Sequence, residues 1–350
     1  MADYRIGGPT SAMSCVLVLL AMCLAGAPVA AQAPQRSKPK DPQRVRLYPK
    51  FQTGQTLYYQ MDFRSRTSGT SEGLIVSPEA SKEQEISISA LVRLDVISVA
   101  PGPSPEARPS VHLRTTYEKV ASTIRTDVPD PQADQLHDRI QQLENKSLEF
   151  TIGAGGQVSG IRGLEDIFPE QQPRLREWLT GIGFTASLPA EGIYPRMKWS
   201  SAPPENSALP LAGIAWESES TYLRDEPCHT VKLTPEETGV QVPNPETCAV
   251  ILSVMSLAGT AKHSDRTPPE FRAKNLRTHG TMSGNGQSLT YISLESGLVV
   301  SVTQTSRQDM DVTVSSDKGG SSLRYQGNVE TQWELSLLPV PSGLPSNPPK

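Results

Sequence analysis

The sequence lacks most of the residue patterns by which a function is recognised. It has only four cysteines and five histidines in 350 residues, and none of them fits a metal-binding motif. Beyond the first thirty or so residues, no apolar run reaches the roughly 20 residues of a transmembrane helix. Basic residues are scattered, so the basic face with interleaved aromatics that nucleic-acid binding needs is missing. We therefore expect no metal or cofactor, no nucleic-acid partner and no transmembrane segment in the mature chain.

The start of the chain is typical of an export signal. A short polar stretch with one cation, Arg5, precedes an apolar run at residues 16–25, and small residues follow as far as Ala31. The run is too short to cross a bilayer and ends like a cleavage site, which we place after Ala31. Residues 1–31 are thus a predicted signal peptide, and the protein is expected in the periplasm or outside the cell.

Two alternatives to a cleaved signal stay open. Residues 20–23 resemble a lipoprotein cleavage box, which would place a lipid on Cys23, although Met22 is bulky where a small residue is preferred. An uncleaved anchor is the other alternative, but the helix-breaking Gly26 and Pro28 argue against it.

Loss of the signal peptide would leave two cysteines, Cys228 and Cys248. Two cysteines about 20 residues apart in an exported chain are expected to form a disulfide. On the chain-entropy model, closing a loop of that size stabilises the fold by about 3 kcal/mol. A redox or metal pair is the competing interpretation, but the spacing is not that of CxxC and no further cysteine completes a zinc site.

Two-residue alternation of apolar and polar side chains dominates the rest of the sequence and predicts long strands. The clearest run, with its apolar face at residues 86–96, predicts a strand of about 14 residues, or roughly 45 Å at strand rise. Similar runs occur at residues 57–64, 111–117, 214–222, 248–258, 289–294, 298–302, 310–314 and 329–337. Strands with one apolar face predict an antiparallel sheet with one side on the core. Residues 248–258 are apolar on both faces and are the predicted most buried strand.

Turns and helices complete the expected elements. Glycine-containing turns are predicted at residues 284–286, 295–297 and 318–320. One helix is predicted to begin at Asp130, as N-cap, and Pro131. A second is predicted to begin near Gly163 and to be split by Pro169, with its better half starting at Pro173. Their apolar stripes are Ala133, Leu136, Ile140 and Leu143 in the first, and Leu175, Trp178, Leu179 and Ile182 in the second. Each stripe is expected to pack on the sheet.

The organisation of the mature chain follows from its composition. Residues 32–50 form a predicted disordered linker, and residues 339–350 a disordered Pro/Ser/Gly tail. Residues 51–338 form the β-rich body between them. The Pro-rich stretch at residues 201–210 is either a domain linker or a long surface loop, so one domain or two stays open.

Catalytic motifs give only chance-level matches. The serine in Gly280-Thr281-Met282-Ser283-Gly284 is one place late for a hydrolase elbow and is expected between strands. Ser315 and Lys318 have the S-x-x-K spacing, but they lie at a strand end without companion motifs. A thiolate–imidazole pair of Cys228 and His229 would need a free Cys228. We therefore predict no catalytic residue.

The remaining polar candidates also have simple structural interpretations. No two histidines lie within ten residues of each other; they are His112, His137, His229, His263 and His279. The carboxylate pairs Glu217 with Glu219 and Asp309 with Asp311 are each interpreted as the solvated face of a strand. The glycine-rich residues 153–156 lack the Lys-Ser/Thr of a phosphate loop and are interpreted as a hairpin turn.

Several short stretches carry a resemblance to a known family. Residues 148–152 and 156–161 give a strand, a glycine turn and a second short strand, followed by an amphipathic helix. Residues 54–59, 188–199 and 248–251 match further parts of the same pattern. With these the chain resembles a family of uncharacterised exported bacterial proteins, over about two thirds of the mature chain. It departs at residues 196–198, where a Gly-Asp is common before the tryptophan. The resemblance implies a β-rich envelope protein and no mechanism.

We therefore expect an α+β body, with a large, twisted, mostly antiparallel sheet, or a partly closed barrel, and two short packed helices. The leading hypothesis is a non-catalytic exported cell-envelope protein whose concave sheet face holds an apolar or lipid-like ligand. One alternative is a secreted hydrolase whose site forms only in three dimensions. Another is a surface or assembly module that pairs through an exposed strand edge.

Overall fold

A computed structural model gives the protein's structure. It describes residues 44–73, 82–102, 107–154, 158–163, 188–189, 191–201, 209–228, 246–259, 266–317, 319 and 322–339. The first five strands are β1 (Thr56–Gly73), β2 (Glu83–Ala100), β3 (Ser110–Thr126), β4 (Ser147–Ile152) and β5 (Val158–Arg162). The others are β6 (Lys198–Ser201), β7 (Ile214–Pro227), β8 (Thr247–Gly259), β9 (Leu276–Ser293), β10 (Val299–Ser316) and β11 (Ser322–Leu338).

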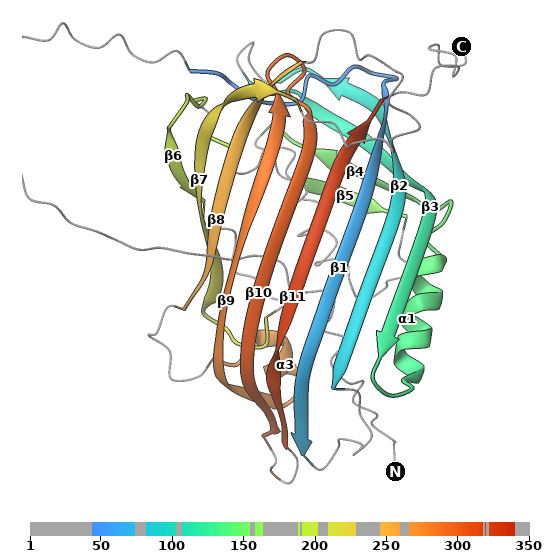
Figure 1. Ribbon diagram of the computed structural model, residues 1–350, viewed down its shortest axis with the longest axis vertical. Coiled ribbons are helices and arrows are strands. Elements are labelled where there is room, and N and C mark those ends of the chain that lie inside the picture. The colour runs from blue at the N-terminus through green and yellow to red at the C-terminus, as the bar shows by residue number, and fades with distance from the viewer. Residues whose placement is uncertain are drawn as a thin grey trace, which may run out of the picture.

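All eleven strands belong to one sheet, in the order β5-β4-β3-β2-β1-β11-β10-β9-β8-β7-β6, and every neighbouring pair is antiparallel. The prediction of a large antiparallel sheet is confirmed. β1 pairs with β11 along nearly its whole length, which joins the two ends of the body at the middle of the sheet. The sheet curls, so that β4 and β5 lie behind β11 and β1 (Figure 1). Its edges are β5 and β6, and among the described strands it is not closed.

Strand alternation gives the sheet two different faces. The inner face is defined here by Leu57, Tyr59 and Met61 of β1, which are buried and belong to the main core cluster. The register sets Met61 opposite Ala90 of β2 and Leu335 of β11, so apolar side chains meet across strands. On the outer face the neighbouring residues of β1 are polar and partly exposed. The apolar core therefore lies on one side of the sheet, as antiparallel sheets commonly arrange it.

One of the two predicted helices is confirmed. α1 (Pro131–Gln141) begins where expected, and a side-chain oxygen of Asp130 accepts a hydrogen bond from the backbone N–H of Gln132 at 2.9 Å. Its buried Ile140 packs on the core cluster. The second predicted helix, at residues 173–182, lies outside the described residues. A short helix that the sequence did not suggest, α3 (Pro269–Ala273), precedes β9.

The structure differs from the sequence prediction at the C-terminal end of the expected linker. Residues 44–50, which the composition placed in a disordered linker, pack against the body. Val45 exchanges two backbone hydrogen bonds with Ile193, and Leu47 is buried in the main core cluster. The apolar side chains Val45 and Leu47 explain the difference, because they give this segment surface to bury. Near residues 201–210, strands on both sides belong to the same sheet.

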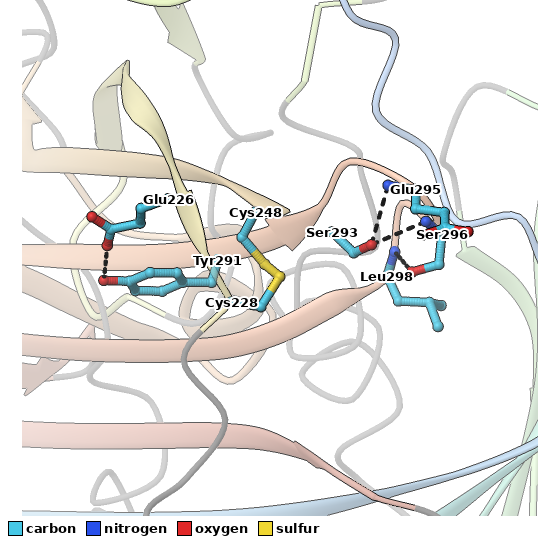
Figure 2. Close-up of a disulfide and its surroundings, with 8 residues drawn as sticks. All are labelled: Glu226, Cys228, Cys248, Tyr291, Ser293, Glu295, Ser296 and Leu298. Carbon is cyan, nitrogen blue, oxygen red and sulfur yellow. Dashed lines mark hydrogen bonds between the residues drawn. A yellow bond between two sulfur atoms is a disulfide. The ribbon is translucent and has the colours of Figure 1, made fainter. Parts of the chain in front are cut away.

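Cys228 and Cys248 form the predicted disulfide, with their Cα atoms 4.9 Å apart (Figure 2). Cys228 directly follows β7, and Cys248 lies in the neighbouring β8. The backbone N–H of Cys228 also donates to the carbonyl of Glu246 at 2.8 Å. The disulfide therefore covalently links the end of β7 to the start of β8.

Two of the three predicted turns are confirmed. Residues 295–297 connect β9 and β10, and Gly319 lies between β10 and β11. Gly297 has a φ of 68°, and a Cβ there would lie 1.9 Å from the carbonyl oxygen of Tyr48, so no larger residue fits. The predicted turn at residues 284–286 is wrong, because these residues lie inside the 18-residue strand β9.

The expected most buried strand is buried at one end. Cys248, Ala249, Val250 and Ile251 have exposed fractions of 0 to 4%, on both faces of β8. Further along the same strand Leu252 and Val254 are only half-buried. The prediction therefore holds for the disulfide end of β8 alone.

Candidate functional site

A belt of uncharged polar side chains crosses the inner face at mid-sheet. The polar belt consists of Ser65 in β1, Thr331 in β11, Gln304, Ser306 and Gln308 in β10, Ser288 in β9, Ser253 in β8 and Ser220 in β7. Six of these eight are buried. The register places them side by side, with Thr331 opposite both Ser65 and Ser306.

Some hydroxyl groups of the polar belt bond to one another across strands. Ser306 Oγ lies 2.6 Å from Thr331 Oγ1, and Ser220 Oγ lies 2.8 Å from Ser253 Oγ. These hydroxyl pairs satisfy part of the hydrogen-bonding capacity of the belt. They also show that polar groups on the inner face contact one another across neighbouring strands at this level of the sheet.

Other polar atoms at the polar belt have no hydrogen-bond partner within the described part of the chain. They are Ser65 Oγ, both side-chain polar atoms of Gln308, and the indole nitrogens of Trp216 and Trp333. Gln308 is only 2% exposed and Trp216 only 3%. An unsatisfied buried polar group costs about 1 to 3 kcal/mol, and folded proteins contain few of them. Their concentration on one face is therefore a feature that needs a chemical explanation.

Trp216 reaches the polar belt because a glycine makes room for it. A Cβ at Gly284 of β9 would lie 3.0 Å from the edge of the Trp216 ring. Gly284 faces Gln308 across the β9–β10 pair. The indole of β7 therefore extends over β8 to lie beside Gln308. This contact also explains why a glycine occupies the middle of a long strand.

The inner face around the polar belt carries no charged side chain. Along β1, β8, β9, β10, β11 and residues 214–222 of β7, no Asp, Glu, Lys, Arg or His falls on this face by strand alternation. Burial raises the pKa of Tyr59, and its hydroxyl donates to the carbonyl of Val299 at 3.2 Å. Along these stretches the described inner face therefore carries no charged side chain; Asp225, beyond residue 222 of β7, faces the same side and accepts a hydrogen bond from the Tyr222 hydroxyl.

Apolar clusters flank the polar belt on both sides. Towards one end of the strands lies the main core cluster, which includes Met61, Val302 and Leu335. Towards the other end lies a smaller cluster that includes Met310, Val312, and Leu211 from the segment before β7. The arrangement along the strands is thus apolar, polar and apolar again.

The outer face has a different character. A groove of about 590 Å³ lies at the middle of the sheet; most of its lining residues belong to the outer face by alternation, but Ser65, Ser306 and Thr331 of the polar belt also line it. Among the residues that line it are Arg64, Arg66, Arg307, Glu85 and Glu330. Arg307 bonds Glu330 at 2.6 Å, and Arg66 bonds Glu83 at 3.2 Å. Exposed cross-strand pairs of this kind contribute at most about 1 kcal/mol each, so we interpret the groove as a solvated strand face.

A second charged cluster lies on β3, β4 and β5. Arg114 donates to Glu149 at 2.6 Å, while His112 and Arg162 lie 3.5 and 3.7 Å from the same carboxylate. The hydrogen bond from Arg114 holds the pKa of Glu149 below its usual value. Because the three strands are neighbours, the cluster ties the β5 edge of the sheet together.

The residues singled out for catalysis are not brought together. Ser283 is exposed on the outer face of β9, within the strand and not between strands as expected. Ser315 lies at the end of β10, and Lys318 lies outside the described residues. His229 and His263 also lie outside them. His279 is exposed on β9, opposite Thr313 of β10.

The structure contains one serine–histidine contact that the sequence did not suggest. Ser122 Oγ of β3 lies 2.9 Å from His137 Nδ1 of α1, and the Gln141 side chain also contacts Ser122. A nucleophile–base pair needs a third group that orients the base. Within the described residues no carboxylate bonds His137. We therefore interpret the contact as a tether between α1 and the sheet.

The two carboxylate pairs lie on solvated strand faces, as interpreted from the sequence. Glu219 bonds Lys198 at 2.6 Å. Asp309 bonds Arg307 at 3.2 Å, and Asp311 bonds Arg324 at 2.7 Å. In the described ranges, no three His, Cys, Asp or Glu side chains gather as a metal site would require.

Two observations bear on membrane contact and assembly. No helix in the part of the chain that the structure describes is long and apolar enough to span a membrane. The edge strands β5 and β6 have only five and four residues. Short edge strands give little backbone to pair with another chain, which weakens the hypothesis of assembly through a strand edge.

Comparison with known proteins adds no identity: no family model matches the chain, and no curated protein matches it significantly. The resemblance to uncharacterised exported bacterial proteins therefore stays a prediction. The polar belt is the candidate functional site.

Proposed function

We propose that the protein is a non-catalytic, exported cell-envelope protein that binds an apolar or lipid-like ligand on the inner face of its sheet. The curled sheet would act as a partly closed barrel whose concave side receives the ligand. Export to the periplasm or beyond agrees with the predicted signal peptide and with the Cys228–Cys248 disulfide, because disulfides persist in oxidising compartments.

The observation that carries this proposal is the make-up of the inner face. It combines two apolar clusters with buried polar atoms that have no partner among the described residues. Ligand sites are commonly apolar surfaces with a few placed polar groups that fix the orientation of the ligand. If the face served only as a core, apolar residues in place of Gln308 and Ser65 would make the fold more stable.

Native mass spectrometry of the protein, exported from cells and purified without detergent, tests the proposal. The expected spectrum contains the mature chain together with mass additions of lipid size, which disappear after extraction with organic solvent. Reloading the extracted protein from mixed lipid vesicles should restore them. A spectrum of the bare chain before and after incubation with vesicles would contradict the proposal.

A further inference from the structure

We propose that the polar belt recognises the uncharged ester portion of an acyl lipid, such as a monoacylglycerol, while the acyl chain lies on a flanking apolar cluster. This inference rests on the proposed function, because it names the class of ligand for the same face. It follows from the hydrogen-bonding capacity, the charge and the spacing of the residues at the belt.

The unpartnered atoms offer both donors and acceptors. The indole nitrogens of Trp216 and Trp333 are donors only, whereas the Gln308 amide and the Ser65 hydroxyl supply donors and acceptors. An ester carbonyl accepts from indole or amide N–H groups. A glycerol hydroxyl can both donate to the Gln308 carbonyl oxygen and accept from Ser65. The complementary partner is therefore a group with a carbonyl and hydroxyls.

The absence of charge from the inner face restricts the ligand further. A buried carboxylate or phosphate needs a cation beside it, since an unpaired buried charge is very unfavourable. On β1, β8, β9, β10, β11 and residues 214–222, the described inner face provides neither Lys nor Arg. Fatty acids and anionic phospholipids are therefore poor partners for the polar belt, and neutral esters are good ones.

The spacing of the groups fits a polar portion of this size. Ser65, Thr331 and Ser306 lie on three adjacent strands, and Gln308 is two residues from Ser306 on the same face. Neighbouring strands are about 4.8 Å apart and each residue adds about 3.4 Å along a strand, so Ser65 and Gln308 are separated by about 12 Å. An ester with its glycerol spans such a distance. The apolar residues beyond Gln308, Met310 and Val312, continue the face as a surface for hydrocarbon.

Binding of monooleoylglycerol and of oleate, which share one acyl chain, to the delipidated mature protein at neutral pH tests the inference. Wild-type protein should bind monooleoylglycerol at least tenfold more tightly than oleate. Gln308→Leu should weaken monooleoylglycerol binding by about tenfold, the effect of losing hydrogen bonds to one buried group. It should also raise the melting temperature of the ligand-free protein, because it removes an unsatisfied amide. Gln332→Leu, at an exposed outer-face position of β11, is the matched control and should change neither lipid affinity.

The outcomes separate this inference from the function on which it rests. Equal binding of both lipids, unchanged in Gln308→Leu, would overturn recognition by the polar belt and leave lipid binding standing. A lower melting temperature for ligand-free Gln308→Leu would also overturn it, because Gln308 would then have a partner within the chain. Failure of both lipids to bind wild-type protein would overturn the inference together with the proposed function.

Discussion

At the scale of single residues, the strongest feature is the contrast between the two faces of one strand. In β10, Arg307 and Asp309 point outward into exposed ion pairs, while Gln308 between them is buried without a partner among the described residues. The charged groups that β10 places on the outer face are therefore solvated and paired. Neutral polar groups on the inner face hold unused hydrogen-bonding capacity, which is what a binding surface requires.

Also at the residue scale, Glu149 predicts how the stability of the fold depends on pH. Its pKa is lowered chiefly by the hydrogen bond from Arg114. A carboxyl whose pKa is lower in the folded state stabilises the fold above its unfolded pKa, and this contribution is lost as the pH falls through the folded pKa. Glu149→Gln should therefore destabilise the protein at pH 7 by at most about 1 kcal/mol, since the cluster is partly solvated.

The measurement is urea denaturation of wild-type and Glu149→Gln protein from neutral pH down through the carboxyl range. The difference in unfolding free energy should shrink towards the acid end. Glu217→Gln, at an exposed position of β7, is the control and should show no such trend. A difference that stays constant with pH would show that the substitution acts through packing and not through charge.

At the scale of elements, the disulfide between the end of β7 and the start of β8 should stabilise the fold by a measurable amount. Cys228→Ala should lower the melting temperature under oxidising conditions, by the equivalent of about 2 to 4 kcal/mol. Fully reduced wild-type protein and reduced Cys228→Ala should melt at nearly the same temperature. Equal loss in oxidised and reduced protein would instead point to the packing of the Cys228 side chain.

The elements also show which parts of the fold the sequence predicts. Alternation identified every long strand, because half-buried strands must alternate, but it found only the apolar ends of β9 and β10. In β10 the inner face turns polar at Gln304, Ser306 and Gln308, so two short apolar runs were inferred where one 18-residue strand exists. The sequence predicts a turn at Gly284 because the contacts that favour a glycine there, with the ring of Trp216 and the backbone of Arg307, come from other strands.

The sequence does not reveal the candidate site for the same reason, because the polar residues of the site interrupt the alternation that predicts strands. The usable signal is the interruption itself. Residues 298–302 and 310–314 are two apolar runs whose alternating apolar residues all have even numbers, so in one continuous strand they would lie on the same face. A continuous strand through that gap places the intervening glutamines on the core face. By contrast, the absence of hydrogen-bond partners for Gln308 and Trp216 within the described residues depends on packing across strands, which the sequence does not show.

At the scale of the whole molecule, the position of β11 makes the body one unit. It lies between β1 and β10, so the last strand of the chain completes the middle of the sheet. The Pro-rich stretch near residues 201–210 therefore does not separate two independent sheets. We expect thermal unfolding in a single transition, with the same midpoint by circular dichroism and by tryptophan fluorescence. Two separated transitions would contradict this account of the body.

The central claim, that the inner face binds lipid at the polar belt, is tested most directly by fluorescence quenching with brominated acyl lipid. Trp216 and Trp333 lie on that face beside the belt, so a bound brominated monoacylglycerol should quench their emission, whereas the unbrominated lipid should not. In the double variant Trp216→Phe/Trp333→Phe, most of this quenching should be lost. Quenching that is absent from wild-type protein, or that persists undiminished in the double variant, would contradict the claim.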